Sequence, residues 1–174
     1  QSNLREKTGI HVVGLWERGL LETPRPQTLI NATSVLLLAG SAEQLEKYDE
    51  VFSSYREYHA TDAPVLILGG GRVGQAAAKT LKERLMTYTV VEKNKRLAKG
   101  SNYIRGNAAD RETLNTAGIK KASSVIITTH DDSINVYLTI YCRKLRPDIQ
   151  IVSRANLDSS ISKLHNAGAD LVMS

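Results

Sequence analysis

Short apolar runs alternate with amphipathic segments from residue 63 onward. The apolar runs are short and nearly continuous, which is typical of strands buried on both faces of a parallel sheet. We expect six strands, at 64–68, 87–91, 103–105, 124–129, 149–153 and 170–173. Between them, apolar residues at helical spacing predict helices at 75–86, 95–99, 111–117, 133–145 and 159–166. This alternation predicts an α/β fold with a doubly wound, six-stranded parallel sheet.

The first 60 residues follow a different pattern. Strands are expected at 10–16 and 34–38, and a short return strand at 19–22 follows a turn. Ser41 is placed to cap a helix. The apolar stripe of this helix consists of Leu45, Tyr48, Val51 and Phe52. Because a breaker-rich joint, Ala-Thr-Asp-Ala-Pro, follows, we expect a small α+β domain over 1–60 and a larger α/β domain over 63–174.

A glycine-rich sequence, Gly-Gly-Gly-Arg-Val-Gly, occupies 69–74 between the first strand and the first helix of the larger domain. It fits the G-x-G-x-x-G pattern of dinucleotide-binding turns, which is a weak signal without this context. Gly69 allows a tight turn, Gly71 lacks the Cβ that would block a pyrophosphate, and Gly74 lets the helix pack closely on the strand. The amides at the helix start can then bind phosphate. A tight turn without a ligand is the alternative.

An acidic residue, Glu92, ends the second strand of this domain, about 20 residues after the glycines. A carboxylate at this place accepts hydrogen bonds from ribose hydroxyls and repels a 2′-phosphate. NAD or an ATP- or ADP-type nucleotide is therefore favoured over NADP, although Lys93 and Arg72 weaken that preference. The glycines and the acid together predict a Rossmann-like domain that binds an adenine nucleotide. A solvated acid at a strand end is the alternative for Glu92.

A polar cluster, His130, Asp131 and Asp132, follows the fourth strand of this domain, where ligands lie in such sheets. Helix capping by the two aspartates is the main expectation, because both occupy positions typical of N-caps. Contact with the nucleotide and binding of a divalent metal ion are the alternatives, and no metal is assigned. Arg154 ends the fifth strand and can reach a phosphate, a subunit partner or a surface ion pair.

Composition narrows the choice of function classes. The 174 residues carry a formal net charge of +5; residues 1–62 have six basic and nine acidic side chains, and 63–174 have seventeen and nine. The basic half contains no nucleic-acid-binding motif, so no nucleic-acid partner is expected.

The single cysteine, Cys142, excludes an internal disulfide and is expected in the core. No nucleophilic or hydride-transfer motif is found, and no apolar run approaches the ~18 residues of a membrane span.

Residues 63–174 resemble the RCK family (regulator of potassium conductance), whose domains are also called TrkA-N. The resemblance rests on the glycine motif with its flanks, on Gly-Asn-Ala-Ala-Asp at 106–110, on Thr-Thr-His-Asp-Asp at 128–132 and on Gly-Ala-Asp at 168–170. Asn107 stands where many members of the family have aspartate, which leaves the ligand preference at that position open.

The N-terminal segment, residues 4–52, resembles the companion TrkA-C (RCK-C) domain more loosely. A C-type unit followed by an N-type unit is similar to the junction between two tandem RCK modules. The resemblance implies a cytoplasmic regulatory module rather than an enzyme, held at the inner face of the membrane by a parent potassium channel or transporter. Self-association into dimers or a gating ring is also implied, with the expected 133–145 helix as a candidate surface.

By the same resemblance, the nucleotide acts as an allosteric ligand that gates the pore. NAD or NADH is the first expectation, and ATP, ADP or AMP are further candidates. A fragment of an NAD-dependent oxidoreductase is the alternative function. The residues expected to bind the nucleotide are Gly69, Gly71, Arg72, Val73, Gly74, Glu92, Lys93, Asn107, Ala108, Thr129, His130, Asp131 and Arg154.

Overall fold

A computed structural model describes residues 4–17, 20–31, 34–58 and 63–174 of the chain. The larger part is a six-stranded sheet in the order β6-β5-β4-β7-β8-β9, and every neighbouring pair is parallel. The expected doubly wound sheet is therefore confirmed. The strand order changes direction between β4 and β7, which places a crevice at the carboxyl ends of these strands. The strands are β4 (Val65–Leu68), β5 (Tyr88–Glu92), β6 (Tyr103–Arg105), β7 (Ser124–Ile127), β8 (Gln150–Arg154) and β9 (Leu171–Met173).

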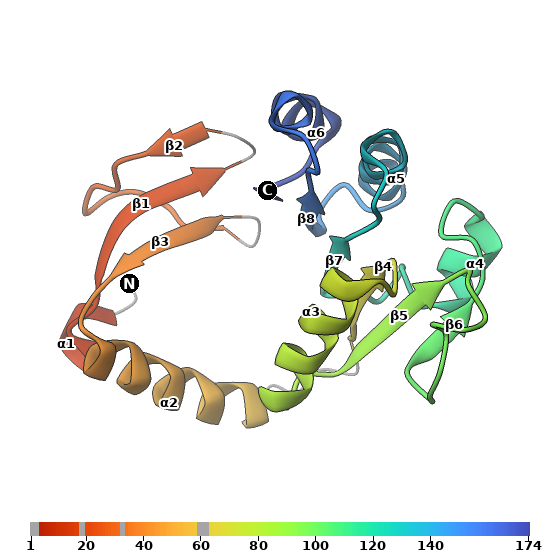
Figure 1. Ribbon diagram of the computed structural model, residues 1–174. Coiled ribbons are helices and arrows are strands. Elements are labelled where there is room, and N and C mark those ends of the chain that lie inside the picture. Colours follow the sequence, from red (N-terminus) through yellow and green to blue (C-terminus); the bar gives the residue numbers. More distant parts are fainter. Residues whose placement is uncertain (1–3, 18–19, 32–33, 59–62) are drawn as a thin grey trace.

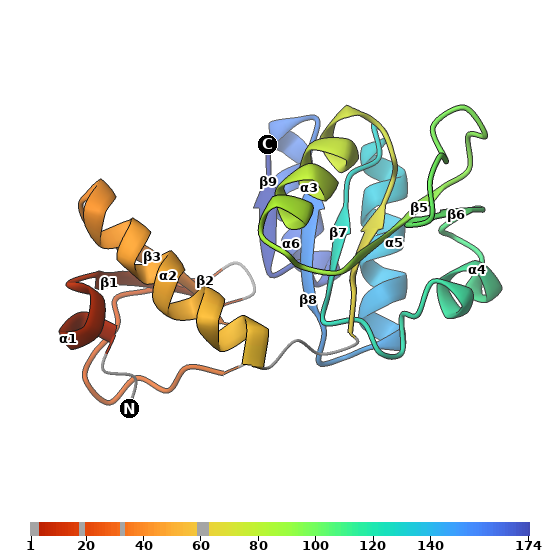
Figure 2. The ribbon, with the colours of Figure 1, turned by 90° about the horizontal axis from the view of Figure 1, so that it is seen from below.

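Helices cover both faces of this sheet (Figure 2). On one face, Ala78 of α3 packs against Ile67 and Val90. On the other face, Leu114 of α4 and Leu138 of α5 join the main hydrophobic core, and α6 packs beside α5. A short 3-10 turn, η1 (Asp158–Ser160), leads into α6. The helices are α3 (Arg72–Glu83), α4 (Arg111–Thr116), α5 (Asp132–Leu145) and α6 (Ile161–Ala167).

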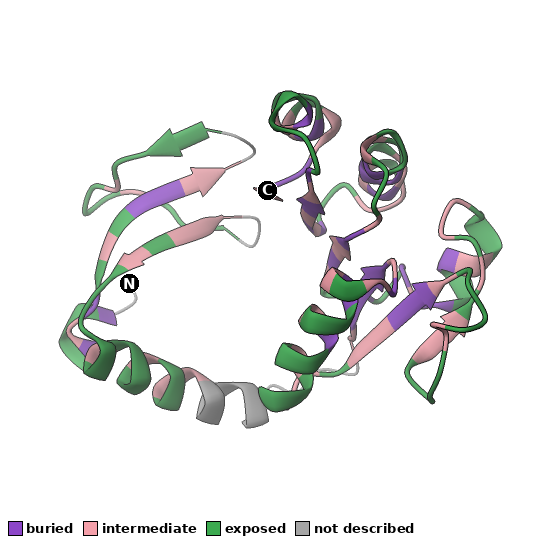
Figure 3. Cartoon of the chain, viewed as in Figure 1, coloured by how far each residue is buried: buried purple, intermediate pink, exposed green. Residues whose placement is uncertain are grey.

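The centre of the sheet is the most deeply buried part of the chain (Figure 3). All four residues of β4 are buried, as expected for a strand with helices on both of its faces. Cys142 is fully buried in the same core, and burial raises the pKa of its thiol to about 12. The thiol is therefore neutral at ordinary pH, and the expected core position of this cysteine is confirmed.

A buried ion pair ties α5 to the last two strands. Arg143 lies 2.9 Å from the carboxylate of Asp170, which is fully buried and also accepts a hydrogen bond from the Ile151 amide at 2.8 Å. Arg143 donates to the carbonyl of Gly168 as well, at 2.7 Å. Gly168 ends α6 with a φ of +114°, a left-handed conformation that glycine adopts without strain. The Gly-Ala-Asp sequence at 168–170 thus serves helix termination and core pairing.

One expected element is wrong. Residues 95–97 form a turn and residues 98–99 have no regular structure, where a short helix was expected. The side chain of Asn94 accepts a hydrogen bond from the Arg96 amide at 2.9 Å, and its backbone carbonyl accepts one from the Ala98 amide at 3.0 Å, so one capped turn forms. The turn does not continue into a helix, because a segment of this length gains too few backbone hydrogen bonds to offset helix nucleation.

The smaller part is an antiparallel three-stranded sheet in the order β2-β1-β3, accompanied by two helices. The strands lie within one residue of their expected bounds, whereas α1 was not expected. Residues 18–19 of the expected turn lie outside the described residues. Ser41 and Gln44 cap α2 reciprocally, since each side chain accepts a hydrogen bond from the other residue's amide. The elements are α1 (Leu4–Thr8), β1 (His11–Glu17), β2 (Leu20–Glu22), β3 (Val35–Ala39) and α2 (Ala42–Tyr58).

The smaller part lies beside the β8–β9 end of the parallel sheet (Figure 1). The ring of Trp16 on β1 approaches the ring of His165 on α6, with centroids 5.5 Å apart. Asp49 of α2 pairs with Arg84 at the end of α3, at 3.2 Å. Among the described residues, no helix is both long and apolar enough to cross a bilayer.

Candidate functional site

The glycine loop at 69–74 joins β4 to α3, and its glycines serve different purposes. Gly69 has a φ of +112°, in the left-handed region. A Cβ on Gly74 would overlap the carbonyl oxygen of Gly69, so only glycine lets α3 pack this close to the loop. A Cβ on Gly71 would meet no atom within 4 Å, so the space beside it is open. The loop therefore presents bare backbone to an empty volume.

This volume lies at the N-terminus of α3. Gly71 is the N-cap residue and offers no side chain to the first amides of the helix. The first amides of a helix have no partner within the helix, and the helix dipole adds positive potential there. An anionic group such as a phosphate is therefore favoured at this point.

Glu92, at the end of β5, accepts a backbone hydrogen bond at each oxygen of its carboxylate, and one of the two donors belongs to the glycine loop. One oxygen accepts a hydrogen bond from the Gly70 amide at 2.6 Å, and the other accepts one from the Asn94 amide at 2.8 Å. Each carboxylate oxygen has a further lone pair. Glu92 can therefore position the loop and still accept hydrogen bonds from two ribose hydroxyls.

These elements line one pocket of about 650 Å³, a size typical of small-molecule sites. Eleven of the thirteen residues expected from the sequence lie on its wall. They are Gly69, Gly71, Arg72, Val73, Glu92, Lys93, Asn107, Ala108, Thr129, His130 and Arg154.

The two remaining expected residues, Gly74 and Asp131, do not line the pocket. Gly74 lies behind the loop, where it permits the close packing described above. Asp131 caps α5, since its carboxylate accepts hydrogen bonds from the Ser133 amide at 2.8 Å and the Ile134 amide at 3.2 Å. Capping, the main expectation for this residue, is confirmed.

Asp132 does not cap α5 through its side chain but binds the loop that follows β8. Its carboxylate accepts hydrogen bonds from the Asn156 amide at 2.7 Å and the Leu157 amide at 3.0 Å. Partial burial opposes ionisation, but the hydrogen bonds outweigh it and lower the pKa of Asp132 to about 2. Among the described residues, no group of three or more histidine, cysteine, aspartate or glutamate side chains is arranged to hold a metal ion.

Eight further residues of the wall were not expected from the sequence. None of them is charged and most are apolar, so their residue types alone do not indicate a binding role. Ile134 and Leu138 lie one turn apart on α5, and this helical spacing is the signal that could have placed both on one face. Thr128 donates a hydrogen bond to the Gly69 carbonyl at 2.8 Å and so braces the loop. The eight are Ala76, Val91, Asn94, Leu97, Gly106, Thr128, Ile134 and Leu138.

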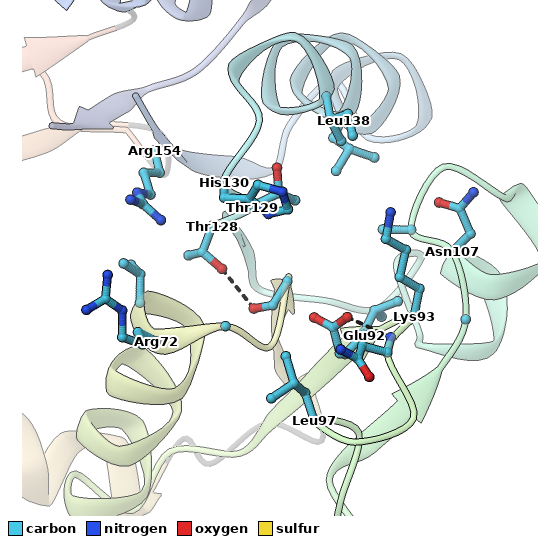
Figure 4. Close-up of a pocket in the computed structure, with 18 of the residues that line it drawn as sticks. Arg72, Glu92, Lys93, Leu97, Asn107, Thr128, Thr129, His130, Leu138 and Arg154 are labelled. Atoms are coloured by element: carbon cyan, nitrogen blue, oxygen red, sulfur yellow. Dashed lines mark hydrogen bonds between the residues drawn. The ribbon is translucent and has the colours of Figure 1, made fainter. Parts of the chain in front are cut away.

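The pocket has two chemically different sides (Figure 4). Lys93 and Asn107 lie on the side formed by β5 and β6, above Glu92. Arg72, at the start of α3, and Arg154, at the end of β8, lie on the opposite side. Two guanidinium groups on one side suit phosphate oxygens, and an acid with an amide on the other side suits a nucleoside.

The chain belongs to the TrkA-N domain family, whose sequence profile matches residues 65–174. It is 33% identical over 112 residues to potassium channel protein 1 of Methanocaldococcus jannaschii, which covers 60% of this chain and 34% of that protein. A solved structure of the GsuK channel bound to NAD matches 99% of this chain and 31% of its own, with 37% identity and a TM-score of 0.69. A structure of GsuK bound to ADP matches 72% and 34%, with 36% identity and a TM-score of 0.61. This chain thus spans about a third of the length of these relatives.

Proposed function

We propose that this chain is a regulatory module of a potassium channel or transporter that binds an adenine nucleotide in the pocket above the glycine loop. The observation that carries the proposal is the pocket itself, which joins open backbone at Gly71, the anchored acid Glu92 and the two arginines opposite it. Membership of the TrkA-N family and the likeness to potassium channels support the physiological setting.

NAD or NADH is the first ligand proposed, and ATP, ADP or AMP are further candidates. Their common adenosine and phosphate groups match Glu92 and the N-terminus of α3. The related GsuK structures contain NAD in one case and ADP in another, which supports this range of ligands. NADP is disfavoured because its 2′-phosphate would face the carboxylate of Glu92.

The nucleotide acts as an effector and not as a substrate. Within the described part of the chain, the pocket wall supplies one imidazole, His130, and no tyrosine, cysteine or serine. Binding regulates the pore because the nucleotide has a higher affinity for one arrangement of the module than for another. A dehydrogenase fragment, the alternative, would need a substrate site beside this pocket and would oxidise NADH when given its substrate.

The module assembles with copies of itself at the cytoplasmic face of the membrane, next to the pore of its parent protein. α5 supplies the self-association surface, since it exposes Ile134, Tyr137 and Ile140 by 38%, 51% and 40%. Tyr137 also stacks on Tyr141, which extends the apolar surface along the helix. The antiparallel sheet with α1 and α2 is the TrkA-C-like unit of a preceding module, and nucleic acid is not a partner.

A thermal-shift titration against NAD, NADH, NADP, ATP, ADP and AMP tests nucleotide binding. A ligand at 100 times its dissociation constant stabilises the folded state by about 2.7 kcal/mol. We expect stabilisation by one or more of the nucleotides other than NADP. No stabilisation by any of them would contradict the proposal.

The Gly71→Val variant provides the matched control. A Cβ at this position meets no atom within 4 Å, and the φ of −71° suits any residue. The variant is therefore expected to melt close to the wild-type temperature but to lose the nucleotide-dependent shift, because valine fills the phosphate position. A variant that retained the full shift would place the nucleotide elsewhere.

A further inference from the structure

β7 and β8 stop pairing where both strands reach the pocket. Their last paired residues are Ile127 and Ser153. Thr129 and Arg154 follow them and line the pocket. Backbone carbonyls that leave a sheet ladder inside a protein need another donor, because an unpaired buried carbonyl is costly.

Asn135 supplies these donors from the first turns of α5. Its side chain is fully buried. Its Nδ2 donates to the carbonyl of Thr129 at 3.1 Å and to the carbonyl of Arg154 at 2.8 Å. Its Oδ1 accepts a hydrogen bond from the hydroxyl of Thr129 at 2.6 Å. One amide group thus joins the ends of both strands, although Asn135 itself does not line the pocket.

From this network we infer that Asn135 is a positioning residue that holds the β7–β8 side of the pocket and thereby sets the preference for a dinucleotide over a mononucleotide. This inference rests on the proposed nucleotide-binding function. Adenosine monophosphate needs the Glu92 side and the start of α3. The second nucleotide half of NAD extends beyond these elements to Thr129 and Arg154, whose positions depend on Asn135.

The test is a comparison of NAD and AMP affinities by isothermal titration calorimetry. In Asn135→Ala, the Arg154 carbonyl loses the Asn135 donor, and Asn135 no longer joins the two strand ends. The Thr129 carbonyl keeps only the long bond from Asn156 Nδ2 at 3.5 Å. NAD affinity is expected to fall by about tenfold and AMP affinity by no more than about twofold. Asn135→Ser, which keeps one donor, is expected to show a smaller change in the same direction and replaces the alanine variant if that variant does not fold.

Thr139→Val is the matched control on the same helix. Thr139 is fully buried, and its hydroxyl donates to the Asn135 carbonyl at 2.7 Å, but it lies one turn further from the pocket. This variant is expected to lower the unfolding temperature and leave the ratio of NAD to AMP affinity unchanged, which separates positioning from general stability.

An unchanged ratio of NAD to AMP affinity in Asn135→Ala, whether both affinities fall equally or neither falls, would overturn the inference while the proposed function stands. Failure of the wild-type protein to bind either nucleotide would overturn the proposed function and this inference with it.

Discussion

At the scale of single residues, the carboxylate of Glu92 is placed for two roles: binding of a ribose and positioning of the glycine loop. The acid that ends the second strand of such domains is expected to bind ribose. In this chain its two oxygens also accept the amides of Gly70 and Asn94, so the same group shapes the glycine loop. Loss of the acid therefore affects the phosphate position as well as the ribose position.

Glu92→Gln tests these two roles. A glutamine amide can accept one of the two backbone hydrogen bonds, but its NH₂ faces the other amide, donor against donor. We expect adenine nucleotide affinity to fall by about tenfold or more and the rejection of NADP to weaken. Calorimetry with ADP and 2′-deoxy-ADP separates the roles, because a loss that acts through the loop is the same for both ligands. An unchanged affinity for ADP would show that Glu92 contributes neither role.

At the scale of elements, the start of α5 connects the pocket to the loop after β8. Asp131 caps the helix, and Asp132 binds the amides of Asn156 and Leu157. The hydrogen bonds to Asp132 favour its ionised carboxylate and lower its pKa to about 2 from its ordinary 3.8. The helix start is thus sensitive to acid.

The sign of this dependence follows from the lowered pKa. Asp132 stabilises the fold above about pH 4, and its contribution is lost as the pH falls through about 2. We expect wild type to exceed Asp132→Asn in unfolding free energy at pH 6 and the gap to shrink as the pH approaches 2, as measured by urea unfolding. The pKa of Asp148 is also lowered, but Asp148 is present in both proteins, so its contribution cancels in the difference between their unfolding free energies. A gap that stayed constant with pH would contradict the assignment.

Most elements could be predicted from the sequence because their signals are local. The continuous hydrophobicity of β4 and the helical spacing in α5 need no knowledge of the rest of the chain. The helix expected at 95–99 forms only one capped turn, because so short a segment gains too few backbone hydrogen bonds to offset helix nucleation. In the site, motif residues were predictable, whereas Leu138 and Asn135 depend on how α5 packs over the strand ends. Such packing has no signature in residue type.

At the scale of the whole molecule, two contacts of different kinds connect the smaller part to the larger part that contains the parallel sheet. Asp49 and Arg84 form an ion pair whose side chains are about half exposed, and such pairs contribute little to stability. The second contact joins β1 to α6, where the rings of Trp16 and His165 lie against each other. Of the two contacts, the aromatic one is therefore the better test of whether the two parts pack together.

Trp16 is the single tryptophan of the chain, so tryptophan fluorescence comes from this ring alone and reports on its surroundings. Removal of the facing ring in His165→Ala exposes the indole to water, and we expect the emission maximum to move to longer wavelength. Arg84→Ala breaks the ion pair without touching the indole and is expected to leave the emission unchanged. An unshifted spectrum in His165→Ala would show that the two rings do not meet in solution.

Among the described strands, the pairing of β4 with β7 is the ladder that joins the two halves of the parallel sheet. A ligand above this seam would contact both halves at once and act as a removable cross-link between them. Its binding would then slow amide hydrogen exchange in β5 and in β8 together, although these strands lie on opposite sides of the seam. With the ligand bound, the two halves of the sheet would thus unfold locally together instead of independently.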